Sequence, residues 1–267
     1  MPRHSVYLLP IALLLFAGDC KKDPVIDPLP EVCLDSPIGI DDTPAAAAPR
    51  FVRREYDKVV QIGGPSKYRW PRETKVLRVR FLNGDTKTRL RVLKYANEWT
   101  ANGSPIRFEL DTAMDSEIRI EFARDGYSQT TVGIAAKKVP DHKATMHFGW
   151  LTAQTEDEKF RRTVLHEFGH ALGLTHEHQS ANAPKIPWKA DRIYRELHGA
   201  NSWWTKERVK KNFLERYSRG QGQYSTYDPA SIMIYPIPVE WVDDPKYVVG
   251  WNTHLSSTDI EWISKNF

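Results

Sequence analysis

The chain has 267 residues, 40% of them hydrophobic, which suits one mid-sized folded domain with a tail. The formal net charge is +4, from 38 Lys and Arg against 34 Asp and Glu, and no Lys/Arg-rich run stands out, so the charge does not indicate a nucleic-acid partner. The two cysteines, Cys20 and Cys33, both precede the expected domain, which must therefore be stabilised by packing and metal rather than disulfides.

Residues 1–20 have the features of an export signal. A weakly basic start is followed by the apolar stretch Tyr7–Ala17, which is too short to span a bilayer. Small residues before Cys20 and lysines after it resemble a bacterial lipoprotein signal, although Asp19 departs from that pattern. We therefore expect an exported protein, either secreted or held at the bacterial cell surface by a lipid on Cys20, with no other membrane contact.

Residues 21–68 are rich in Pro, Asp and Ala. Such a segment buries too little apolar surface to offset its ordering entropy, so we interpret it as a tether or a pro-segment. Arg53 and Arg54 are either a cleavage site within it or an ordinary surface pair. The folded domain is expected over residues 69–267.

Within this domain, strands are expected first and helices later. Lys75–Phe81 alternates apolar and basic residues, which predicts a half-buried strand. The elements that follow are a turn at 83–85, a helix over 86–101, strands over 106–110 and 117–122, a loop and strand over 126–134, a strand over 145–150, and helices over 156–173 and 205–217. A last helix is expected to begin at 256–259, where Thr258 and Glu261 have the spacing of a capping box. This order favours an α+β fold.

The stretch HEFGHALGLTH, which begins at His166, has the spacing of a metal site. His166 and His170 are four residues apart and stack on one face of a helix, and Glu167 lies at the edge of that face. Gly173 allows the chain to leave the helix in a left-handed turn, so that His176 can return to the metal. Three protein ligands leave a fourth position open, which is typical of a catalytic Zn²⁺ ion.

This pattern is the zinc signature of the metzincins, and the residue after its third histidine, Glu177, resembles the astacin family. A second match, Tyr227–Tyr235 with the sequence YDPASIMIY, resembles the astacin Met-turn, although Ile234 replaces the histidine often found there. The resemblance extends from about Trp70 to the C-terminus. Because the domain has no cysteines, it is similar to compact bacterial members of the astacin-like group.

The resemblance implies a metzincin-type catalytic domain. Its N-terminal half would hold a mixed, twisted sheet over the active-site helix, and its C-terminal half would be mostly irregular or helical, with the Met-turn. It also implies hydrolysis of peptide bonds in proteins by a zinc-activated water, with Glu167 as general base. Met233 would lie beneath the zinc, and Tyr235 would be a fifth zinc ligand at rest that later hydrogen-bonds the oxyanion. Substrate is expected to pair with an edge strand at residues 145–149 of a monomeric enzyme.

Several interpretations stay open. In astacins a buried glutamate at the position of Glu177 receives the new N-terminus after processing, and the alternative interpretation of equal weight is a surface or helix-end glutamate. Cys33 is a latency ligand for the zinc, an inert tether residue, or a disulfide partner of Cys20. The main alternative to an enzyme is a non-enzymatic cell-surface binding protein that keeps the metzincin fold. A protease with one narrow target would carry the same motif.

Overall fold

The computed structural model describes residues 33–36, 68–101, 104–200, 204–218 and 224–267. The expected export signal, Cys20, and the pair Arg53 and Arg54 lie outside the described residues. Cys33 is described only as part of a backbone strand. In the described part of the chain, no helix has the length and apolar character needed to cross a membrane.

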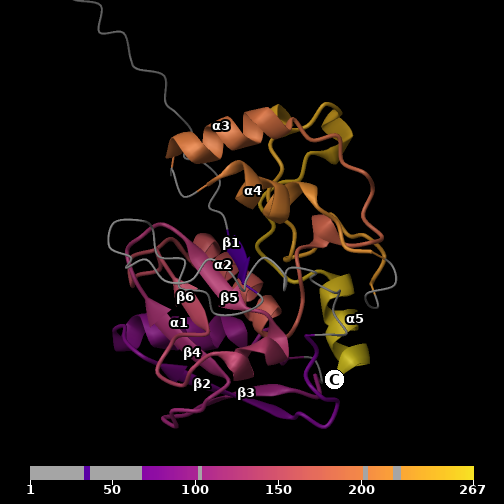
Figure 1. The fold of residues 1–267 in the computed structure, drawn as a ribbon. Helices are drawn as coiled ribbons and strands as arrows, with labels where there is room; N and C mark the ends of the chain where they lie inside the picture. Colours follow the sequence, from indigo (N-terminus) through magenta and orange to yellow (C-terminus); the bar gives the residue numbers. More distant parts are fainter. Residues whose placement is uncertain (1–32, 37–67, 102–103, 201–203, 219–223) are drawn as a thin grey trace, which may run out of the picture.

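A mixed sheet of six strands forms the lower half of the molecule in Figure 1, in the order β1-β5-β6-β4-β2-β3. Neighbouring strands run parallel except β5 and β6, which are antiparallel. The strands are β1 (Cys33–Ser36), β2 (Val76–Phe81), β3 (Arg107–Leu110), β4 (Ile118–Phe122), β5 (Ser128–Thr131) and β6 (Met146–Phe148).

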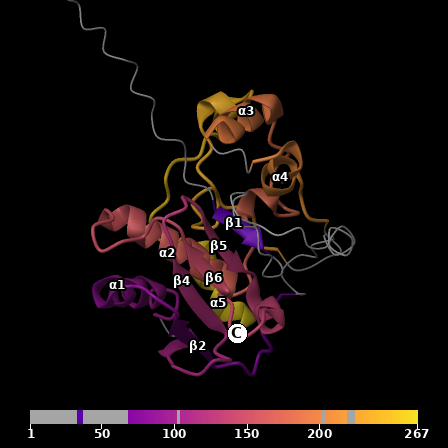
Figure 2. The same cartoon turned by 60° about the vertical axis from the view of Figure 1, so that its left-hand side comes forward.

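Two long helices, α1 (Thr86–Ala96) and α2 (Asp157–Ala171), lie on one face of this sheet, as Figure 2 shows. The second half of the chain holds helices and helical turns separated by irregular backbone. Its α-helices are α3 (Ala190–Ala200), α4 (Lys206–Val209) and α5 (Ser257–Asn266), and η5 (Lys210–Leu214) is a π-helix. The remaining short helical turns are η3 (Gly133–Lys138), η4 (Glu177–Gln179), η7 (Val239–Trp241) and η8 (Pro245–Tyr247).

The main core lies between the sheet and these two long helices. Leu77, Val79 and Ile120 from the strands are fully buried, as are Val164 and Phe168 from α2. Each such side chain contributes about 1.5–3 kcal/mol when it is removed from water. The helix that carries the metal motif is therefore fixed against a rigid platform.

The expected elements of the first half are confirmed, with shorter bounds. The helix expected over 86–101 ends at Ala96. At its start, the Asp85 side chain caps the helix by accepting a hydrogen bond from the Thr88 backbone N–H. The helix expected over 205–217 is divided into α4 and η5 and ends at Leu214. The sequence interpretation did not include α3, although its buried residues, Ile193 and Leu197, have helical spacing.

Two expectations are wrong. Ser256 and Asp259, not Thr258 and Glu261, form the capping box of α5, because the helix begins at Ser257. The strand expected at the sheet edge over 145–149 is β6, which lies between β5 and β4 and is paired on both sides. Alternation along a strand reports which face is buried and carries no information on whether the strand has a free edge.

Candidate active site

The helix α2 begins and ends at well-defined caps, which places its last turn accurately. At its start the Glu156 carboxylate accepts hydrogen bonds from the backbone N–H groups of Glu158 and Lys159. At its end Gly173 has φ of +102°, and its N–H donates to the carbonyl of His170. The Leu174 N–H donates to the carbonyl of Gly169, which completes a Schellman motif. Gly173 thus turns the chain out of the helix, as the sequence predicted.

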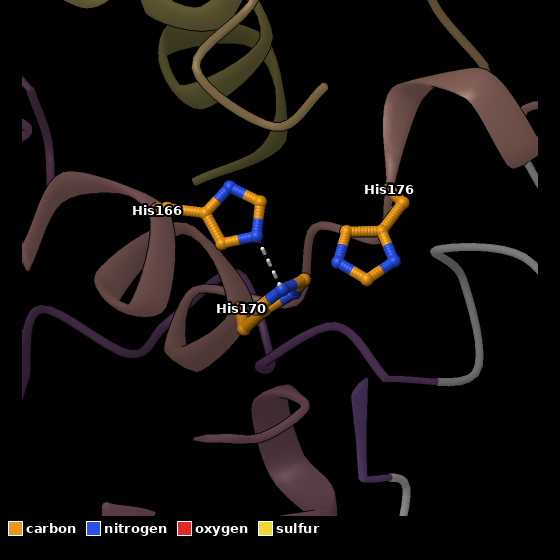
Figure 3. A group of neighbouring side chains, drawn as sticks. All are labelled: His166, His170 and His176. Atoms are coloured by element: carbon orange, nitrogen blue, oxygen red, sulfur yellow. Dashed lines mark hydrogen bonds between the residues drawn. The ribbon is translucent and has the colours of Figure 1, made fainter. Parts of the chain in front are cut away.

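This turn brings the three predicted histidines together, as Figure 3 shows. Nitrogens of His166, His170 and His176 all lie within 4.8 Å of one another, and none of the three residues is more than 3% exposed. The Nε2 atoms of His166 and His170 are 3.2 Å apart. Two nitrogens bound to one tetrahedral zinc at the usual bond length are separated by about 3.3 Å, so this spacing fits a shared ion.

The other ring nitrogens of the two helical histidines are held by backbone carbonyls. Nδ1 of His166 lies 2.8 Å from the oxygen of Ile232, and Nδ1 of His170 lies 2.9 Å from the oxygen of Leu174. A carbonyl can only accept, so each Nδ1 carries the proton and each Nε2 keeps its lone pair for a metal.

Burial favours the neutral form of two of the imidazoles, those of His166 and His176. Burial, followed by the charge of His170, lowers the pKa of both His166 and His176 well below the ordinary value for histidine. Neutral imidazole is the form that binds zinc. The donor types and spacing of the triad fit a single Zn²⁺ ion with three protein ligands. The tautomers of His166 and His170 and the neutral form of His166 and His176 agree with this.

Glu167 lies beside the triad and is 1% exposed. Its Oε2 accepts a hydrogen bond of 2.6 Å from the Oγ1 of Thr130, which belongs to β5. Charge-assisted bonds of this kind are short and strong, so one carboxylate oxygen is fixed by the sheet. The sequence analysis did not identify Thr130, because no local pattern connects a strand residue to a helix 37 positions later.

Met233 and Tyr235 come to the site from the second half of the chain, and both are buried. A Cβ atom at Gly169 would lie 2.3 Å from the Met233 sulfur, so the glycine inside the motif is needed for this close contact. The Tyr235 ring centroid is 4.1 Å from that of His176 and 5.9 Å from that of His166. Tyr235 therefore borders the triad and Met233 packs against Gly169 of the motif, while the ligand role of Tyr235 stays a prediction.

A small cavity of about 20 Å³ adjoins His166 and Glu167. Besides Tyr235, its lining residues are Trp150, Arg162, Thr163 and Trp251. Arg162 is 4% exposed and donates to the carbonyls of Ile234 and Asn252, at 2.7 and 2.6 Å. Its guanidinium lies 4.5 Å from the centre of the Trp251 ring. The cavity is thus lined by two tryptophans and by the buried guanidinium of Arg162. The zinc motif alone does not predict these residues.

Glu177, which follows His176 in the chain, is partly buried. Its Oε1 accepts a hydrogen bond of 3.0 Å from the Asp228 backbone N–H. Burial raises the pKa of its carboxyl to about 8, and the nearby Asp259 and Asp228 add to this rise. A second small cavity is lined by both Glu177 and Asp259. Glu177 is therefore not the simple surface glutamate of one interpretation.

The strand β1 places the backbone of Cys33–Ser36 beside the site. It pairs in parallel with β5, and Asp35 lies opposite Thr130, the residue that holds Glu167. Residues from the expected tether or pro-segment therefore occupy the outer edge of the strand nearest the general base (Figure 1).

Comparison with known proteins agrees with this geometry. The family model described as Matrixin, peptidase M10, matches residues 70–191. A solved structure of myroilysin is 36% identical, with a TM-score of 0.71 over 76% of this chain and 97% of that one. A second myroilysin crystal structure is 31% identical, with a TM-score of 0.61 over 90% of this chain and 92% of that one. A search of curated proteins found no match.

A more distant match shows the fold alone. High choriolytic enzyme 1, a hatching enzyme zinc-protease from the medaka fish Oryzias latipes, is 15% identical, with a TM-score of 0.50 over 74% of this chain and 93% of that one. Together with the histidine triad, the two myroilysin matches are decisive: the chain belongs to the metzincins. It is a zinc metalloendopeptidase, which acts on proteins or peptides and uses one catalytic zinc. The alternative of a non-enzymatic binding protein is therefore set aside.

Proposed function

We propose that the protein is an exported, astacin-like endopeptidase in which Glu167 is the general base. One observation carries the assignment of the base: Glu167 is buried beside the three histidines with one oxygen fixed by Thr130. This hydrogen bond orients the carboxylate beside the histidines, where it would accept the proton of the attacking water and deliver it to the leaving amine. The astacin-like assignment is supported by Glu177 and by the Met-turn sequence that ends at Tyr235.

The other groups around Glu167 would activate the water, stabilise the oxyanion and contact the substrate. When bound, zinc acts as a Lewis acid that lowers the pKa of a water molecule toward 7 and polarises the scissile carbonyl. Tyr235 is the side chain best placed to donate a hydrogen bond to the developing oxyanion, because its ring packs against His176. The small cavity bordered by Trp150 and Trp251 adjoins Glu167 and would lie beside the scissile bond of a bound peptide.

The outer edge of β5 is the proposed binding edge for an extended substrate. This strand carries Thr130, which contacts the base, and its inner edge is already paired with β6. Backbone pairing of a peptide with a strand edge tolerates many sequences, while side-chain pockets set the preference. The substrate strand is thus β5 rather than the segment 145–149 expected from the sequence.

The segment 21–68 would act as a pro-segment rather than only as a tether. Its strand β1 pairs with the same edge of β5 that substrate needs, so the two compete for one set of backbone hydrogen bonds. If Cys33 is also a zinc ligand in the precursor, a Cys33→Ala variant should show higher activity before processing. If the precursor activity of Cys33→Ala is unchanged, Cys33 is not a zinc ligand, and competition between β1 and substrate for the edge of β5 is the remaining cause of latency.

Glu177 would receive the N-terminus that processing creates. Its carboxyl is partly buried, with its pKa raised to about 8, next to a cavity that it shares with Asp259. An ammonium group in that cavity would provide the counter-charge that the buried carboxylates need. Processed protein with Glu177→Gln should therefore lose stability relative to processed wild type, whereas the precursor should not.

Export would proceed by the signal at residues 1–20, with Cys20 as the site of a lipid anchor. A Cys20→Ser variant tests the anchor, because it should abolish incorporation of a labelled fatty acid and release the protein from the cell surface. If the wild-type protein incorporates no label and is found in the medium, it is secreted without an anchor. Gel filtration of the processed form would test the expected monomer.

The general base is tested with Glu167→Ala and a matched control, Glu158→Ala, which removes an exposed carboxylate from the first turn of the same helix. We expect Glu167→Ala to keep its zinc and to lose a factor of about 10²–10⁴ or more in kcat, the range for general-base catalysis. Tyr235→Phe should lose less, and Glu158→Ala almost nothing. Full activity of Glu167→Ala would contradict the mechanism.

A further inference from the structure

His166 is linked to a carbonyl that is itself part of a longer hydrogen-bonded chain. The Nδ1–H of His166 donates to the carbonyl of Ile232, 2.8 Å away. That carbonyl belongs to the peptide group whose N–H is on Met233, and this N–H donates to the Oγ of Ser231 at 3.0 Å. The Ser231 hydroxyl then donates to Oδ1 of Asp259 at 2.7 Å. Every bond in the chain points the same way, from imidazole to carboxylate.

Asp259 lies at the far end of this chain, in the first turn of α5, and is 4% exposed. Its second oxygen, Oδ2, accepts the backbone N–H groups of Ile232 and Ser256, at 2.8 and 2.9 Å. Burial raises the pKa of Asp259, and these hydrogen bonds together with that of Ser231 oppose the rise. With three donors directed at it, the side chain is placed as an acceptor for the Met-turn as well as a cap for α5.

The alignment matters because hydrogen bonds in series polarise one another at low dielectric. A carboxylate at the end of the series makes the Ile232 carbonyl a stronger acceptor, which favours the proton on Nδ1 of His166 and leaves Nε2 free. Metal-bound histidines commonly have a carboxylate in direct contact with the second nitrogen. Here the carboxylate would act at a distance, through one hydroxyl and one peptide group. The corresponding nitrogen of His170 is held by Leu174 within its own helix end.

We propose that Asp259 is a positioning residue for the zinc ligand His166, acting through Ser231 and the peptide group between Ile232 and Met233. The proposal rests on the zinc site described above. In this arrangement the C-terminal helix α5 is connected to the metal site by hydrogen bonds. Ser231 links the two ends, because its hydroxyl accepts from the Met233 N–H and donates to the Asp259 carboxylate.

Two substitutions break the chain at different points, and a third serves as a control. Asp259→Asn keeps the side-chain volume but presents an amide, and Ser231→Ala removes the hydroxyl while both backbone bonds to Asp259 Oδ2 are kept. Ser256→Ala removes the hydroxyl that accepts the Asp259 N–H in the capping box, but leaves the Met-turn bonds intact. It therefore weakens α5 without touching the chain of hydrogen bonds.

The measurement is the zinc dissociation constant of the full-length chain, by competition with a chromophoric chelator, together with the ¹⁵N shifts of the histidine rings in zinc-free protein. Loss of an outer partner of a zinc ligand typically weakens zinc binding about 10–100-fold. We expect this loss for Asp259→Asn and Ser231→Ala, a shift of His166 but not His170 toward the Nε2–H tautomer, and a change under about threefold for Ser256→Ala.

The proposal is overturned if Ser231→Ala binds zinc as tightly as wild type, or if Ser256→Ala loses as much affinity as the other two. Should Asp259→Asn fail to fold, Ser231→Ala decides alone, because it leaves the backbone bonds to Asp259 in place. A wild-type chain that binds no zinc would refute the proposed enzyme itself, which is a different result from equal affinities across the variants.

Discussion

The two halves of the domain are held together in different ways. Residues 68–173 build their structure from strand pairing and long helices around the main apolar core. In the described part of residues 174–267 the regular elements are helices and helical turns, none of them a strand of the sheet, and side chains satisfy many backbone groups. Gln179 donates to the carbonyls of Lys211 and Glu215, and Asn252 donates to those of Pro229 and Ser231. The first half is thus a platform, and the second depends on individual polar contacts.

The active site joins these halves. His166, Glu167 and His170 come from the platform, whereas His176, Met233 and Tyr235 come from the second half. Zinc bound to all three histidines would therefore act as a cross-link between a rigid part and a weakly supported part. The predictions below test that contrast, beginning with the largest expected effect.

Metal removal should affect the two halves unequally. At a free zinc concentration 1,000 times the dissociation constant, bound metal stabilises a fold by about 4 kcal/mol. Amide hydrogen exchange with and without a chelator should show large losses of protection around His176 and Ile232–Tyr235, and small losses in β2 and β4. A uniform change over both halves would contradict the distinction between platform and second half.

A cavity in the platform should lower global stability without a specific effect on zinc. Ile120 in β4 is fully buried, and replacing it with alanine should cost about 2–5 kcal/mol in the free energy of unfolding. Denaturant unfolding of zinc-loaded protein measures this cost, with Ile260→Ala, on an exposed position of α5, as control. If Ile120→Ala weakens zinc binding under conditions where the protein is folded, the two halves are more strongly coupled than proposed.

The link from β5 to the general base should affect catalysis rather than folding. Thr130→Val keeps the shape of the side chain but removes the hydrogen bond to Glu167. A hydrogen bond to a charged group contributes about 1.5–3 kcal/mol, which corresponds to a fall in kcat of about 10–100-fold. Zinc content should not change. Thr131→Val, at a neighbouring buried position of the strand, should retain near-normal kcat, and equal losses in both variants would refute the link.

The smallest expected effect is a loss of folding stability at low pH that comes from one contact in the first half of the domain, between Glu117 and Arg78. Burial alone would raise the pKa of Glu117, but hydrogen bonds from the side chain and backbone of Arg78 outweigh it and lower the pKa. The stabilisation is therefore complete above the unfolded pKa of about 4.3 and is lost as pH falls through the lower folded pKa. In acid unfolding followed by circular dichroism, Glu117→Gln should be less stable than wild type at pH 6 and converge with it near pH 2.

A matched substitution checks that assignment. Glu73→Gln removes an exposed carboxylate from the same half and should leave the acid transition where it is in wild type. If Glu73→Gln and Glu117→Gln change stability equally at pH 6, the contact with Arg78 is not the source of the pH dependence.

The same contrast explains what the sequence could predict. The three histidines, Glu167 and Gly173 could be identified because helix spacing and a left-handed turn are local properties of consecutive residues. The strands of the platform were also predictable from alternation, although their ends and their order were not. The expected edge position of β6 was wrong because pairing partners are set by tertiary structure.

The supporting residues could not be found in the same way. Thr130 is 37 positions from the glutamate it holds, and Asp259 is 28 positions from Ser231. A lone threonine or aspartate carries no periodic signal, and only the folded chain brings it to its partner. The helix α3 was overlooked although Ile193 and Leu197 mark one face, because the segment before it contains prolines and no clear cap.

Zinc content and proteolysis, measured on the same sample, test the central claim most directly. The processed protein should contain one zinc per chain, cleave casein, lose that cleavage when a chelator removes the metal, and regain it when zinc is restored. Glu167→Ala, measured in parallel, should contain the same amount of zinc and cleave nothing detectable. Casein cleavage that persists at zero zinc, or full cleavage by the zinc-loaded Glu167→Ala variant, would contradict the account.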